Sequence, residues 1–349
     1  MKAYENSYSY ASIYREEGLK GILKLLKQDS LKKSYIKRLI DFDNKHFMAI
    51  KFLEHIADIE DGMGKFGVRA QMAKLNEKFA LNLEIFNGLE NGDIDKTKGL
   101  LIYGVNHPAV IEGFIPLAFL KQKRIKIVGD VMYYHLGKNL RKIIIPVAPR
   151  KSTFEANNIF LRKLNPLVRF NNAEIQNNEH RKVNNLKTLK KSAETLEKGG
   201  VVLIFPGGAG DERTKWRGGL SRIIMNVNKS KRDDITLVPL YFSGLGSFRM
   251  LVRLYRAYRG KKLKPQRVGI YFGREKKLSE FYNMFGNNIT EKKILVYLRK
   301  DAFSQFGLKE FPMRNYLYPK YYPKAAGYGY RYAVKLLLQV LSVGGIIKG

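Results

Sequence analysis

The sequence has no cysteine, and this absence excludes a disulfide framework, a thiolate metal site and a cysteine nucleophile. Negative charge is scarce as well: 31 Asp and Glu stand against 64 Lys and Arg, which gives a formal net charge of +33. So large a positive excess predicts an anionic partner. Three classes fit: a nucleic acid, an anionic lipid surface, or a phosphorylated substrate.

Long apolar runs are also missing. No stretch of 18 or more apolar residues occurs, so we expect no transmembrane helix, and the polar first nine residues predict no signal peptide. The histidines show no metal-ligand spacing, and the sequence has neither a P-loop nor a serine elbow. We therefore expect no metal and no bound cofactor. Hydrophobic residues still make up 45% of the 349 residues, which excludes wholesale disorder and allows a sizeable core.

The pattern of apolar residues divides the chain into three regions. Residues 1–97 carry apolar side chains at helical spacing and are expected to form an N-terminal helical region. Residues 98–280 contain short apolar runs with helical patterns between them, which predicts an α/β domain with a largely parallel sheet flanked by helices. Residues 281–349 are expected to form a helical, Tyr-rich extension with an amphipathic end. The expected strands lie at residues 99–105, 125–128, 143–147, 201–205, 237–242 and 268–272.

A histidine follows the first of these strands. Asn106, His107 and Pro108 lie where that strand ends and a helix is expected to begin, with His107 at the N-cap and Pro108 at the first helical position. Glu112 follows five residues after the histidine. A carboxylate on one imidazole nitrogen fixes the tautomer, and the other nitrogen can then accept a proton from a substrate hydroxyl. On spacing alone, a structural N-cap histidine beside an unrelated surface glutamate is the simpler interpretation.

Four sequence blocks, in order, resemble the glycerolipid acyltransferase superfamily. Residues 106–112 match its N-H-x-x-x-x-D block, with Glu in place of Asp as in the late acyltransferases of lipid A biosynthesis. Residues 128–133 and 143–150 look like the second block, which ends in a basic residue after a short strand. Residues 202–209 resemble the F-P-E-G-T-R block in the Phe-Pro-Gly-Gly form of diacylglycerol-type acyltransferases, and residues 237–240 resemble the fourth block.

The resemblance spans roughly residues 98–245 and implies a reaction. A fatty acyl group would move from acyl-CoA or acyl carrier protein to a hydroxyl of a glycerolipid such as lysophosphatidic acid. His107 would be the general base, oriented by Glu112. Arg150 and Lys151 would meet the phosphates of the donor's carrier. The residues that stabilise the developing oxyanion are not identified by the resemblance.

The third block departs from the family at two positions. Gly207 stands where Glu is usual and Gly210 where Arg is usual, so the family's acceptor-phosphate clamp is not reproduced. Backbone N–H groups of Gly207 and Gly208 can approach an anion closely, with Arg213 and Lys215 nearby, and these four are the candidate substrate-binding residues of this block. A plain strand-to-loop turn followed by a solvated charged loop remains an open alternative.

Basic and aromatic clusters predict where such a protein would act. Arg249, Arg253 and Arg256 are spaced to share one face of a helix, residues 311–332 hold seven Tyr, and residues 336–347 are largely apolar. Together they predict a peripheral protein docked on an anionic membrane surface, at the cytoplasmic face.

Two other functions stay open. The first is a basic nucleic-acid-binding protein, which leaves the four ordered blocks unexplained, so a nucleic acid is not an expected partner under the leading interpretation. The second is a catalytically degenerate acyltransferase fold that only binds lipid, which the altered third block allows.

Overall fold

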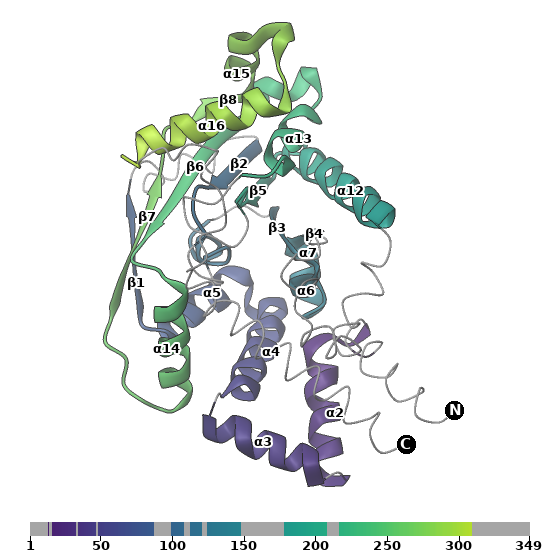
Figure 1. Ribbon diagram of the computed structural model, residues 1–349, viewed down its shortest axis with the longest axis vertical. Coiled ribbons are helices and arrows are strands. Elements are labelled where there is room, and N and C mark those ends of the chain that lie inside the picture. Colours follow the sequence, from purple (N-terminus) through teal and green to yellow (C-terminus); the bar gives the residue numbers. More distant parts are fainter. Residues whose placement is uncertain are drawn as a thin grey trace, which may run out of the picture.

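A computed structural model of the protein describes residues 13, 16–32, 34–46, 48–86, 99–107, 112–120, 124–147, 178–207 and 216–308. In this part of the chain, eight strands form one sheet with helices on both faces (Figure 1). The α/β class with a largely parallel sheet is therefore confirmed. The strands, in chain order, are β1 (Leu81–Phe86), β2 (Gly99–Gly104), β3 (Ile125–Asp130), β4 (Ile144–Val147), β5 (Val201–Ile204), β6 (Ile235–Ser243), β7 (Gln266–Phe272) and β8 (Lys276–Lys277).

The order of the strands places β2 near the middle of the sheet. Seven strands run β1-β7-β6-β2-β5-β3-β4, and the short β8 pairs with β6. The five strands from β6 to β4 are parallel, whereas β7 is antiparallel to β6, and β1 is parallel to β7. Since β2 lies between two parallel neighbours, its carboxyl end opens at the edge where open α/β sheets usually carry their sites.

The apolar runs form buried strands because both faces of the sheet are covered. Along β2, Leu100 and Ile102 pack into one hydrophobic cluster with α4, α5 and η2, whereas Leu101 and Tyr103 pack into a second with α12, α13 and α16. Every residue of β2 is buried, as expected for a strand inside a parallel sheet.

The helices divide between the two ends of the molecule. In Figure 1, α12, α13, α15 and α16 gather around the upper part of the sheet, while α2 to α5 and α14 lie at the lower end. Helix α12 is followed by Lys-Gly-Gly, with Gly199 at a φ of 74°. The bounds are α2 (Gly18–Lys32), α3 (Ser34–His46), α4 (Ala49–Phe66), α5 (Val68–Lys78), η2 (Ile115–Ala118), α6 (Val131–Tyr134), α7 (Lys138–Ile143), α12 (Asn178–Glu197), α13 (Gly219–Met225), η4 (Lys229–Asp234), α14 (Ser247–Tyr258), α15 (Leu278–Phe285), η5 (Gly286–Asn288) and α16 (Glu291–Gln305).

Two features differ from the sequence prediction. Residues 81–86, inside the region expected to be helical, form β1 and extend the sheet next to β7. The helix expected after His107 is absent from residues 112–120, where a turn leads into the single 3-10 turn η2. Among the described helices, none is both long and apolar enough to cross a bilayer.

Candidate active site

The end of β2 is fixed by the residue that precedes the histidine. The backbone N–H of Val105 donates to the carbonyl oxygen of Leu240 at 2.8 Å, which continues the ladder between β2 and β6. The buried Asn106 side chain extends it further: Nδ2 donates to the Phe242 carbonyl oxygen at 2.8 Å, and Oδ1 accepts from the Phe242 N–H at 3.0 Å. Because the amide reproduces a backbone pair, the chain that enters His107 is held rigidly at the sheet edge.

His107 and Glu112 meet at this edge. Nδ1 of His107 is hydrogen bonded to Oε1 of Glu112, whose side chain has an exposed fraction of 0%, whereas the His107 side chain remains 16% exposed. The carboxylate comes from the turn before η2, where the Ile115 N–H donates to the Glu112 carbonyl oxygen at 3.3 Å. In the residues that the structure describes, Nε2 of His107 has no hydrogen-bond partner. The pair therefore holds one imidazole nitrogen and leaves the other for a substrate.

The neighbouring strand contributes an aromatic wall. Phe205 directly follows β5, and its ring stacks on the His107 imidazole with centroids 4.4 Å apart and planes 19° apart. Phe205 is the phenylalanine of the third block, and no local sequence signal predicts that its ring stacks on the histidine. Parallel pairing of β2 with β5 brings the two rings together, because both follow the carboxyl ends of adjacent strands.

Residues on both sides of positions 208–215 lie at this edge. The half-buried Gly207 lies in the turn after β5, and the Pro206 carbonyl oxygen accepts from the Arg217 N–H at 2.9 Å. Trp216 is buried against Tyr103 of β2, with an edge-on ring contact of 5.9 Å. Pro206 therefore lies close to Arg217, and Trp216 contacts the strand that precedes His107.

The other substrate-binding candidates lie outside the part of the chain that the structure describes. Gly208, Arg213 and Lys215 lie outside the described residues, and so do Arg150 and Lys151. Their assignments stay predictions from the sequence. The described residues contain no group of three or more His, Asp or Glu side chains with the geometry to hold a metal ion.

The arginines of α14 do not form one free face. Arg249 and Arg256 are exposed, but the Arg253 guanidinium turns inward and donates to the carbonyl oxygens of Phe79 and Ala80 at 2.6–3.0 Å. Burial, with the charge of Arg256, lowers the pKa of Arg253. The expectation that Arg253 shares a free face with Arg249 and Arg256 is therefore wrong, because its guanidinium ties α14 to the start of β1. Membrane docking itself stays a prediction. Helical spacing indicated which side of α14 carries Arg253, but it did not indicate that residues 79 and 80 pack against that side.

A scan against models of known protein families finds no match to this chain, and a search of curated proteins finds none either.

Proposed function

We propose that the protein is an acyltransferase in which His107 is the general base and Glu112 its orienting carboxylate. The observation that carries the proposal is the His107–Glu112 hydrogen bond at the carboxyl end of a central parallel strand, with Nε2 left open. Two further facts support it: the sequence blocks that resemble the glycerolipid acyltransferases occur in order, and the first and third of them lie side by side around His107 and Phe205.

The arrangement suits acyl transfer from a thioester to an alcohol. Nε2 takes the proton from the acceptor hydroxyl as its oxygen attacks the thioester carbonyl, and Glu112 stabilises the imidazolium that forms. When the tetrahedral intermediate collapses, the C–S bond breaks and the imidazolium gives its proton to the departing thiolate. The products are the acylated acceptor, the free thiol of CoA or acyl carrier protein, and the neutral histidine.

Substrate roles follow the sequence prediction. Arg150 and Lys151 bind the phosphates of the donor's carrier, while Arg213 and Lys215, with backbone N–H groups of Gly207 and Gly208, bind an anionic acceptor such as lysophosphatidic acid. This acyl transfer involves no oxidation or reduction, and none of its steps requires a metal ion.

The direct test supplies the full-length protein with acyl-CoA or acyl-acyl carrier protein and a panel of lyso- and diacylglycerolipids. Mass spectrometry should show one acceptor gaining one acyl chain, and the His107→Gln variant should lose that product. Failure of every acceptor, with donor binding intact, would support the catalytically degenerate lipid-binding alternative.

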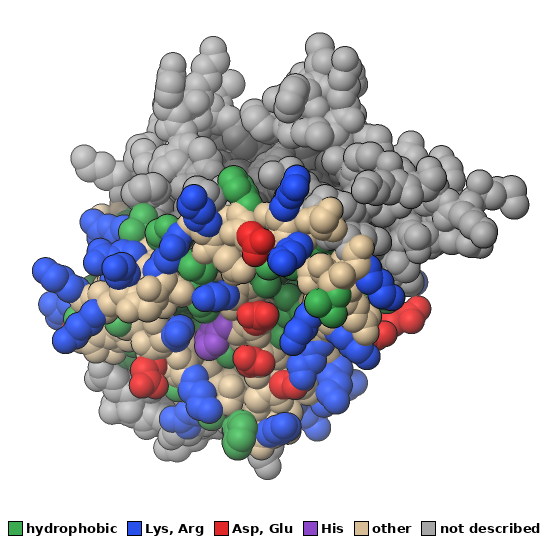
Figure 2. All heavy atoms as spheres, turned by 90° about the horizontal axis from the view of Figure 1, so that it is seen from below, with side chains coloured by type: hydrophobic (Ala, Val, Ile, Leu, Met, Phe, Trp, Pro, Cys, Tyr) green, Lys and Arg blue, Asp and Glu red, His purple; other side chains and the backbone are tan. Residues whose placement is uncertain are grey.

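We place the protein at an anionic membrane surface, because the lower end of the molecule is cationic and partly apolar. On α14, the exposed Arg249, Arg256 and Arg259 lie beside Val252 and Tyr255, whose exposed fractions are 39% and 37%. Lys and Arg side chains are spread over much of this face (Figure 2). Each basic residue near an anionic bilayer contributes about 1 kcal/mol, and a shallow apolar pair adds burial in the interface.

Vesicle flotation tests this placement with two matched charge reversals. Arg256→Glu/Lys262→Glu alters the lower end, whereas Lys292→Glu/Lys293→Glu changes the same charge on the exposed start of α16. Binding to vesicles that contain anionic lipid should weaken more in the first variant and fall with salt. Equal loss in both variants would refute a localised face, and tight binding to nucleic acid without vesicle binding would favour the basic nucleic-acid-binding alternative.

A further inference from the structure

Phe205 lies in the centre of a stack of three rings. Its ring stacks on the His107 imidazole with centroids 4.4 Å and planes 19° apart, and it also stacks on Phe242 with centroids 6.4 Å and planes 28° apart. The three residues come from β5, the end of β2, and β6, which are neighbours in the sheet. The imidazole is therefore the outermost ring of a stack that begins in the core, where Phe242 is buried.

Gly104 makes room for this ring, and Gly113 lies in van der Waals contact with it. A Cβ on Gly104 would lie 2.2 Å from Cδ1 and Cε1 of Phe205, and a Cβ on Gly113 would lie 3.6 Å from its Cε2. Gly104 ends β2 and Gly113 directly follows Glu112, so the phenyl ring packs against the block on both sides of the His107–Glu112 pair. Any larger residue at position 104 would displace the ring.

The stack supplies a restraint that the carboxylate cannot. A hydrogen bond at Nδ1 fixes one point of the imidazole, but the ring can still turn about the line of that bond and swing Nε2 away. An aromatic plane against the ring face removes that rotation. The same face attracts a cation more than a neutral ring, so it favours the imidazolium that forms during proton transfer.

We propose that Phe205 is a positioning residue for His107, which holds the plane of the imidazole and stabilises its protonated form. This inference rests on the proposed role of His107 as general base. Phe205 itself touches no reacting atom, so its effect must reach the reaction through the histidine.

The test compares variants that keep or remove the aromatic face. Phe205→Leu and Phe205→Met remove it while keeping an apolar side chain, Phe205→Tyr retains it, and Phe242→Leu removes the second ring stacked on Phe205. We expect Phe205→Leu and Phe205→Met to lower kcat by about 10-fold with KM within about twofold, because Nε2 is misoriented and substrate binding is not changed. Phe205→Tyr should keep kcat near wild type, and Phe242→Leu should lower kcat less than Phe205→Leu does.

A second readout follows the imidazole itself and needs no turnover. The ¹³C-labelled His107 resonance, assigned by its loss in His107→Gln, is followed in each variant by NMR relaxation. Without the aromatic face the imidazole should relax as a more mobile ring, because no neighbouring plane then restrains its rotation.

The outcomes separate this inference from the function it rests on. Unchanged imidazole relaxation and kcat in Phe205→Leu, with His107→Gln inactive, would overturn the positioning role alone. Equal losses in Phe205→Leu, Phe205→Tyr and Phe242→Leu would reduce Phe205 to core packing and also overturn it. Transfer activity retained in His107→Gln would overturn the proposed function, whereas the NMR relaxation would still decide whether Phe205 restrains the imidazole.

Discussion

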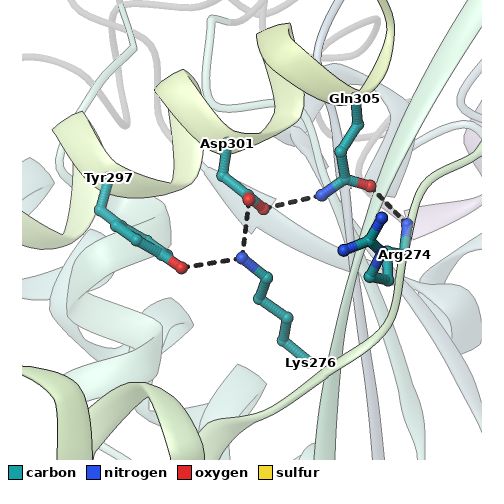
Figure 3. A network of polar contacts seen from close by, with 5 residues as sticks. All are labelled: Arg274, Lys276, Tyr297, Asp301 and Gln305. Carbon is teal, nitrogen blue, oxygen red and sulfur yellow. Dashed lines mark hydrogen bonds and ion pairs between the residues drawn. The ribbon is translucent and has the colours of Figure 1, made fainter.

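Two acid–base pairs lie in different parts of the sheet and differ in what surrounds them. His107 and Glu112 meet at the carboxyl end of β2, whereas Lys276 of β8 pairs with Asp301 of α16. Lys276 Nζ donates to Asp301 Oδ1 at 2.6 Å and to the Tyr297 hydroxyl at 2.8 Å, and Gln305 donates to the second carboxylate oxygen at 2.7 Å (Figure 3).

The difference separates a structural pair from one that can transfer a proton. Burial lowers the pKa of Lys276, but the hydrogen bonds that the amine donates to Asp301 and Tyr297, with the charge of Asp301, outweigh it. The pKa is therefore raised, and the charged amine ties α16 to β8. Both oxygens of Asp301 are also occupied. His107 has the same kind of partner at one nitrogen, but its second nitrogen has no partner among the described residues and the ring is partly exposed. A proton acceptor that no described residue occupies, and not the pairing itself, distinguishes the candidate active site.

The largest effect should follow removal of the histidine. His107→Ala should lower acyl transfer by about 10²–10⁴-fold, the range for loss of a general base. The Tm should fall as well, because the fully buried Glu112 carboxylate loses its hydrogen bond to His107, but the protein should stay folded at the assay temperature. The rate with saturating donor and acceptor checks this, and thermal unfolding is the control. If the Tm collapsed together with the activity, the pair would resemble Lys276–Asp301 and the contrast would fail.

A smaller catalytic effect should follow a shorter carboxylate. Glu112→Asp withdraws the oxygen by one methylene, so we expect a loss of about 10–10²-fold in kcat, and Glu112→Gln should reduce kcat less than His107→Ala does. Steady-state kinetics with both substrates varied measures the loss. Full activity in the Asp variant would show that the turn before η2 adjusts freely and that Glu112 is not tightly positioned.

Disrupting the Lys276–Asp301 pair should lower stability without affecting catalysis. Lys276→Met removes the donor to Asp301 and Tyr297, and we expect the free energy of unfolding to fall by about 1–3 kcal/mol, with kcat within about twofold of wild type. Denaturant unfolding measures the change. Lys277→Met is the matched control, because the adjacent exposed lysine has only a 3.4 Å contact with Thr236. A large loss of activity in Lys276→Met would connect the two regions and break the comparison.

The smallest effect concerns His55, a histidine of α4 that faces α14. Burial, helped by the charge of Lys78 and opposed by Asp58, lowers the pKa of His55, whose ring contacts Tyr258 at 5.9 Å. The unfolded state therefore binds the proton more readily, so this contribution to stability is full above about pH 6.5 and is lost as the pH falls below that value.

His55→Leu tests that linkage. The Tm of the wild type should fall between about pH 7.5 and about pH 5.5 by more than the Tm of the variant does. Acyl transfer by the variant should match wild type at both pH values once the folded fraction is accounted for. Parallel Tm curves would show that His55 makes no pH-dependent contribution.

Sequence patterns predicted the elements whose residues are buried on both faces. The runs that became β2 and β5 are apolar throughout, and both strands were predicted. Strand β1 was missed because it directly follows four helices and only its first residue is buried. Local periodicity did not separate this half-exposed strand from the helical region before it.

At the candidate site, contacts between residues far apart in the sequence limited what could be predicted. The spacing of His107 and Glu112 allowed a pair, but their meeting depends on a turn in place of the expected helix. Asn106 bonds to Phe242, 136 residues away, and Arg253 bonds to Phe79, 174 residues away, so no local pattern contains either contact. These partners are defined only when the strand order is known.

The most direct test of the central claim follows the thiol and the acyl chain in one reaction. The chain has no cysteine, so a thiol-reactive dye reports only the CoA released from acyl-CoA, while mass spectrometry counts the acylated acceptor. The proposal predicts that wild type releases one thiol per acceptor acylated and that His107→Ala loses both signals together. Thiol release without acylated acceptor, or equal transfer by His107→Ala, would contradict it.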